Sequence, residues 1–132
     1  MFHLHKKLFL CSAISVCFIG NSSKIHEPDP EIIKTYTNIP EINNWVTIPK
    51  ETKEITIYVQ AKHTETVLFW LVPTGTATWK ERRLIGCDTD GIDGWSVKWN
   101  VNGEGLHHHI SVQALGLTSI SSDSINVHTE YK

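Results

Sequence analysis

The segment Val67-Leu-Phe-Trp-Leu-Val72 is apolar throughout and is followed directly by the turn sequence Pro73-Thr-Gly-Thr76. A short apolar run with β-branched and aromatic residues, ended by turn residues, predicts a buried β-strand. Successive side chains of a strand point to opposite faces, so we expect three of them to face a core: Val67, Phe69 and Leu71. Leu68 and Trp70 would then lie against a neighbouring strand or form an outer apolar strip.

The same two-residue period continues on both sides of this segment. In Glu54–Ala61, Ile55 and Ile57 share one face while Glu54 and Thr56 share the other. Further strands are predicted at 82–87, 95–101 and 108–115, and in a last segment that carries Ile125 and Val127. Turn residues separate these segments, and none has a useful helical period. About seven short strands of this kind predict an all-β fold, an antiparallel sandwich.

Residues 1–20 have the features of a secretory signal peptide. Lys6 and Lys7 precede the uncharged run Leu8–Gly20. Such a run suits a signal peptide and is shorter than the roughly 20 residues that span a bilayer. An uncleaved membrane anchor is the alternative. Because Ile14-Ser-Val-Cys17 resembles a lipobox, a lipoprotein-type signal with Cys17 lipidated is a further alternative.

Residues 21–48 separate this leader from the domain that we predict at 49–132. Prolines 28, 30 and 40 lie in this region, and Pro49 follows it directly. Proline removes a backbone donor and stiffens the chain. We therefore interpret 21–48 as a linker that contains a weak edge strand somewhere between Lys34 and Ile48.

The composition of the mature chain limits its function. Cys11 and Cys17 fall in the leader, so we expect Cys87 to be a lone thiol, which excludes an internal disulfide and fits a small apolar core residue. Without the leader, the chain has ten basic and fourteen acidic residues, a net charge of −4. A nucleic-acid-binding module needs a basic face. The one basic cluster, Lys80–Arg83, is interrupted by an acid, and we predict that it lies on the solvated face of a strand.

Five motifs follow one another between Lys53 and Thr129. They are Val67-x-Phe69-x-Leu71, Leu84-Ile-Gly86 with Asp88, Trp95-Ser-Val-Lys-Trp-Asn100, His108-x-Ile110-x-Val112-x-Ala114 and Ser122-x-Ser124-Ile-x-Val127. Together they resemble the bacterial immunoglobulin-like (Ig-like) domains of exported and cell-surface proteins. The resemblance implies an Ig-like sandwich of about seven strands, and an extracellular module that spaces, presents or binds rather than one that catalyses. In that family the histidine-bearing strand usually continues into Ala-x-Asp, whereas Leu115 and Gly116 follow Ala114 here.

Two groups of residues have metal-binding chemistry. Asp88, Asp90 and Asp93 offer oxygen ligands of the kind that Ca²⁺ prefers, but without the glutamate and flanking helices of an EF-hand. His107 and His109 project from one face of the predicted strand and could share a Zn²⁺ ion if a third ligand joined them. An acidic turn and solvated histidines are the alternatives, which we favour, and we expect no cofactor.

Trp70 and Trp79 are the candidate ligand-binding residues. The chain has five tryptophans, of which Trp95 and Trp99 have the period of core residues. If Trp70 and Trp79 are exposed together beside the Pro73–Ala77 turn, they would form a stacking platform for sugar rings or an anchor for a protein. Packing at the rim of the core is the alternative.

No catalytic site is predicted, because the sequence has no Gly-x-Ser-x-Gly, no glycine-rich phosphate loop and no His-Glu-x-x-His. We expect a secreted or surface-tethered, non-enzymatic Ig-like module that binds or spaces, in adhesion or at the cell envelope. Its partner would be an extracellular protein or glycan and not a nucleic acid, and it would contact a membrane only through its leader or a lipid anchor. The alternatives are a carbohydrate- or cell-wall-binding module with exposed tryptophans and a small metal-binding accessory protein.

Overall fold

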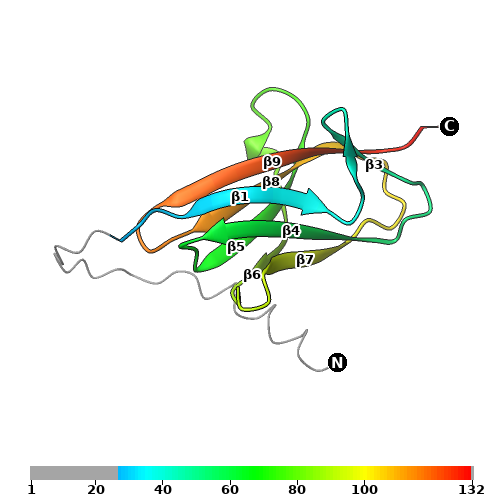
Figure 1. Cartoon of the computed structure of the whole chain (residues 1–132). Coiled ribbons are helices and arrows are strands. Elements are labelled where there is room, and N and C mark those ends of the chain that lie inside the picture. Colours follow the sequence, from blue (N-terminus) through cyan, green and yellow to red (C-terminus); the bar gives the residue numbers. More distant parts are fainter. Residues whose placement is uncertain (1–26, 132) are drawn as a thin grey trace.

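Two β-sheets lie face to face in the computed structural model, which describes residues 27–131 (Figure 1). Three antiparallel strands form the first sheet, in the order β1 (Glu31–Thr37), β4 (Glu54–Lys62) and β7 (Trp95–Asn100). Six strands form the second sheet, in the order β2 (Glu41–Ile42), β3 (Trp45–Ile48), β9 (Ile120–Thr129), β8 (His107–Leu115), β5 (Thr66–Pro73) and β6 (Arg83–Asp88). The predicted all-β sandwich is confirmed.

The core lies between the sheets and contains most of the alternate residues that the sequence predicted, although Ala61 and Val97 are only partly buried. Phe69 on β5 and Val112 on β8 are fully buried, as is Ile57 on β4 in the opposite sheet. Fully burying one such side chain stabilises the fold by about 1.5–3 kcal/mol. The inner faces are therefore the main source of stability.

The sandwich begins earlier in the chain than the sequence indicated. β1 starts at Glu31, inside the region interpreted as a linker, and pairs with β4. Two features hide this strand: its buried residues include Thr35 and Thr37, and a bulge between Ile32 and Lys34 interrupts the two-residue period. The expected weak edge strand resolves into β2 and β3, which raises the number of strands in the described region to nine.

Strand β3 joins the two ends of the domain. It pairs in parallel with β9 over four residue pairs, from Trp45 with Asn126 to Ile48 with Thr129. Val46 and Ile48 of β3 belong to the core. On the other side of the sandwich β6 lies against β7, where a Cβ atom on Gly86 would stand 2.7 Å from Val97. A glycine at this position allows the two strands to approach.

Cys87 is disulfide-bonded in the structure of the full chain, which includes residues 1–20 and the other two cysteines. The expectation of a lone thiol applies to the chain after removal of that leader, and it stays a prediction. Residues 1–20 with the predicted signal peptide, and Cys17 with its predicted lipidation, lie outside the described residues. Between residues 27 and 131 no helix is long and apolar enough to cross a membrane.

Replacing Phe69 with alanine should lower the free energy of unfolding by about 3–5 kcal/mol, because the change removes a fully buried ring and leaves a cavity between the sheets. Chemical denaturation followed by circular dichroism measures this. Leu84→Ala is the control: its side chain is 49% exposed on the edge strand β6, and its loss should change stability by less than about 0.5 kcal/mol. A loss below about 1 kcal/mol at Phe69 would contradict its place in the core.

Candidate functional site

Trp70 and Trp79 lie together on the outer face of the six-stranded sheet. Trp70 is half-buried on β5, and its side chain points away from the core because Phe69 and Leu71 point into it. Trp79 begins the short 3-10 helix η2 (Trp79–Glu81) and is 42% exposed. The two ring centroids are 6.0 Å apart with the planes at 65°, an edge-to-face contact. The predicted pair is therefore brought together.

The connection between β5 and β6 brings Trp79 back over the sheet. Gly75 and Ala77 have positive φ angles of 133° and 57°, which turn the chain sharply. The Thr78 hydroxyl then donates a hydrogen bond to the carbonyl oxygen of Pro73 (2.7 Å), and η2 packs against β5. The basic cluster Lys80–Arg83 consequently lies mostly on η2 and in the connection after it, not on a strand as predicted.

Trp70 is fixed in its orientation by the neighbouring strand. Its Nε1–H donates a hydrogen bond to Oε1 of Gln113 on β8, at 2.8 Å. Directly opposite Trp70 on β8 is Ser111, which pairs in turn with Ser124 on β9. Two serines, Ser111 and Ser124, therefore form a row that continues from the Trp70 indole across the sheet.

Arg82 completes this site, and the sequence reasoning missed it. Its guanidinium carbon lies 4.9 Å from the ring centroid of Trp70 and 4.5 Å from that of Trp79. Its Nη1 donates a hydrogen bond to the carbonyl oxygen of Trp79 (3.1 Å). Each cation–π contact at an exposed site contributes about 0.5–1 kcal/mol. We call Trp70, Trp79 and Arg82 the indole–guanidinium cluster.

The acidic loop after β6 closes on itself through hydrogen bonds. Asp88 is 1% exposed, and its two carboxylate oxygens accept the backbone N–H groups of Asp90 and Ser96, each at 3.0 Å. Asp90 accepts the N–H of Ile92 (3.1 Å), and Asp93 is exposed. These bonds are those of an acidic turn that stabilises its own backbone.

His107 belongs to an aromatic group that the sequence could not reveal. Its ring stacks on Trp45 of β3, with the centroids 5.0 Å apart, and His128 of β9 meets the same indole edge-on at 5.1 Å. The parallel pairing of β3 with β9 creates this group from distant parts of the chain.

His109 is half-buried and stands opposite Asn126 in the register of β8 with β9. Within residues 27–131 no three His, Cys, Asp or Glu side chains gather in a way that could hold a metal ion.

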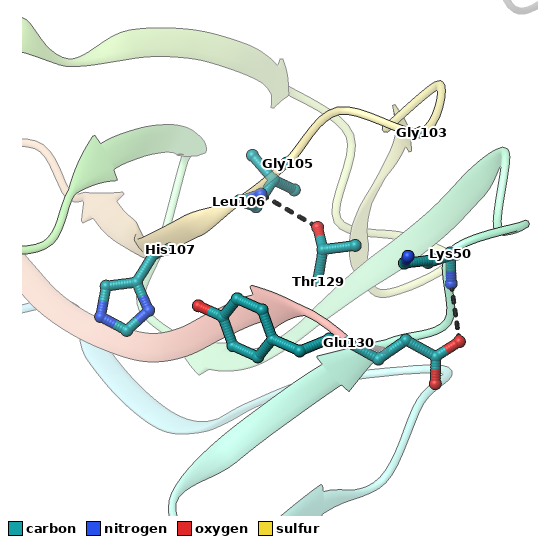
Figure 2. Close-up of a pocket in the computed structure, with 8 residues that line it drawn as sticks. Lys50, Gly103, Gly105, Leu106, His107, Thr129 and Glu130 are labelled. Atoms are coloured by element: carbon teal, nitrogen blue, oxygen red, sulfur yellow. Dashed lines mark hydrogen bonds between the residues drawn. The ribbon is translucent and has the colours of Figure 1, made fainter.

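An open hollow of about 530 Å³ lies beside His107, at the end of β8 (Figure 2). Figure 2 shows that polar groups of its wall bond to one another: the N–H of Leu106 donates to the Thr129 hydroxyl, and the N–H of Lys50 donates to the Glu130 carboxylate, each at 3.0 Å. These two bonds connect the segments before β4 and β8 to the end of β9 at the wall of the hollow.

His108 points to the other face of β8 from His107 and His109, as expected for a residue at the edge of the core. Burial lowers its pKa below the ordinary value of 6.5, an effect that the nearby Glu104 carboxylate opposes. Its Nδ1 accepts a hydrogen bond from the backbone N–H of His107 at 2.9 Å, which requires that nitrogen to be unprotonated. Both observations favour a neutral His108 in the folded protein.

Comparisons of this chain with protein-family models, with curated proteins and with solved structures gave no match. The candidate site is therefore argued from its own geometry.

The lowered pKa of His108 makes stability depend on pH. The unfolded chain takes up a proton near pH 6.5 and the folded chain only at lower pH, so the stability that His108 contributes is complete above about pH 6.5 and falls as the pH drops toward its folded pKa. We expect the melting temperature to decrease between pH 7.5 and 5.5, and His108→Gln to reduce this difference. His63→Asn, which alters an exposed histidine and keeps a residue that tolerates its positive φ angle, should leave it unchanged. An equal pH effect in wild type and His108→Gln would contradict the assignment.

Proposed function

We propose that this protein is an exported, non-enzymatic Ig-like module that binds a ligand through the indole–guanidinium cluster. The order of the strands supports the class. In Ig domains, strands A, B and E share one sheet while strands C, F and G share the other. The sheet β1-β4-β7 has the order A-B-E, and β5, β8 and β9 follow one another as C, F and G do.

The observation that carries the proposal is that the exposed ring of Trp79 is held in place by Trp70 and Arg82. Indole combines a large apolar surface with one hydrogen-bond donor, and tryptophan and arginine are the residues most enriched where binding energy concentrates. Here a 42% exposed indole is supported by a second indole, which is hydrogen-bonded to β8, and by a guanidinium over both. Trp79 does not belong to the hydrophobic core, so its ordered, exposed ring is available to bind a ligand.

Asp88, His107 and His108 have the chemistry of a catalytic base, and each takes part in a structural contact, which supports a binding function. The carboxylate of Asp88 accepts two backbone N–H groups. His107 is stacked on Trp45, and His108 is hydrogen-bonded to the backbone.

The size of the site favours a glycan over a protein as the ligand. Protein interfaces bury about 800 Å² on each partner around an apolar centre. The apolar surface here is that of one exposed indole and one half-buried one, and the neighbouring row contains Ser111 and Ser124. An apolar ring beside hydroxyl groups suits a sugar, which has an apolar ring face and a polar rim.

Removing the exposed indole should weaken binding strongly. We expect Trp79→Ala to weaken binding on a glycan array by about thirtyfold or more, which is the effect of truncating a residue that contributes at least about 2 kcal/mol. Ile92→Ala is the control, because Ile92 is 90% exposed in the acidic loop, outside the cluster. Equal losses in both variants, or binding to extracellular proteins and to no glycan, would contradict the proposal.

Export is proposed from the charged and apolar pattern of residues 1–20. When the full-length gene product is expressed in a bacterium, mass spectrometry of the extracellular or surface fraction should find a chain that has lost this segment. A diacylglycerol adduct on Cys17 would identify the lipoprotein alternative. An intact chain confined to the cytoplasm would contradict export.

A further inference from the structure

We propose that the indole–guanidinium cluster recognises a sugar ring that carries a carboxylate, as a uronic acid residue does. The inference rests on the proposed function and adds the chemical class of the ligand. In this arrangement the sugar ring packs against the exposed indole of Trp79, and the carboxylate pairs with the guanidinium of Arg82.

The guanidinium of Arg82 has donors to spare. An arginine side chain has five N–H donors, and one is used on the carbonyl oxygen of Trp79. In the region that the structure describes, Arg82 forms no ion pair, whereas the adjacent Arg83 pairs with Glu104 at 2.8 Å. Of two neighbouring arginines, one has its charge matched within the fold and the other presents it beside two indoles.

Arg82 is also held in place before any ligand arrives. Both indoles contact its guanidinium, and the bond to Trp79 fixes its position relative to η2. Trp70 is fixed in turn by Gln113. A flexible arginine loses conformational freedom when it binds an anion, and a guanidinium that is already ordered loses less. The cluster is thus preorganised for an anion at a defined distance from an apolar ring.

The charge of the site matches a carboxylate better than a phosphate. A phosphate monoester carries about −1.5 to −2 charges at neutral pH. Arg82 supplies one positive charge, Glu81 lies between Lys80 and Arg82 in the chain, and the charge of Arg83 is already paired. One planar guanidinium meets the two oxygens of one planar carboxylate in a bidentate pair.

Matched oligosaccharides test this inference with the full chain. The probes are hexamers of galacturonate, mannuronate and hyaluronan, the methyl ester of each, a sulfated galactan hexamer, and neutral hexamers of galactose, mannose and N-acetylglucosamine. Isothermal titration at 50 and 500 mM NaCl gives the affinities of wild type, Arg82→Gln, Arg82→Lys, Trp79→Ala and the control Arg83→Gln. Circular dichroism verifies that each variant is folded.

We expect at least one uronate hexamer to bind about tenfold or more tightly than its methyl ester, the scale of a charge-assisted hydrogen bond. Arg82→Gln should remove this preference and the salt dependence, Arg82→Lys should restore only part of it, and Arg83→Gln should leave it unchanged. The inference is overturned if esters or neutral hexamers bind as tightly as the acids, if the sulfated hexamer binds best, or if Arg82→Gln has no effect. In those cases binding that Trp79→Ala abolishes would leave the proposed function standing, whereas no binding to any hexamer would overturn both.

Discussion

Phe69, Val112 and Ile57 meet solvent nowhere, because the two sheets close over them from opposite sides. This packing between the inner faces is the constraint on which the rest of the domain depends. Backbone pairing holds each sheet together, but a single sheet leaves one apolar face exposed to water, and only the second sheet covers it. Because side chains alternate along a strand, fixing the inner face also fixes which residues point outward.

The candidate site follows from that alternation. With Phe69 and Leu71 committed to the core, Trp70 must leave the core and appear on the outer face of the six-stranded sheet. The connection of β5 to β6 then returns over this face, supported by the bond from Thr78 to Pro73, and adds Trp79 and Arg82 to it. The residues of β5 that face the core thus determine that Trp70 faces outward, and the connection between β5 and β6 packs against it.

Local pattern was enough to predict the strands with clear alternation, and it also selected Trp70 and Trp79. It missed β1, because buried threonines and a bulge conceal the period. Arg82 could not be found from local pattern, since its role depends on the path of the connection around it. The group of Trp45, His107 and His128 was equally hidden, because parallel pairing of β3 with β9 joins residues about eighty positions apart.

That parallel pairing also has a mechanical consequence. β3 lies near the N-terminal end of the domain and β9 near its C-terminal end, and the two strands are parallel. A force that pulls the two chain ends apart therefore loads this pair in shear, along the direction of the strands. Once the load passes β1 and reaches β3, the four residue pairs between Trp45 and Ile48 on one side and Asn126 and Thr129 on the other must slide together. Bonds loaded in shear resist jointly, whereas an antiparallel pair pulled from one end would unzip bond by bond.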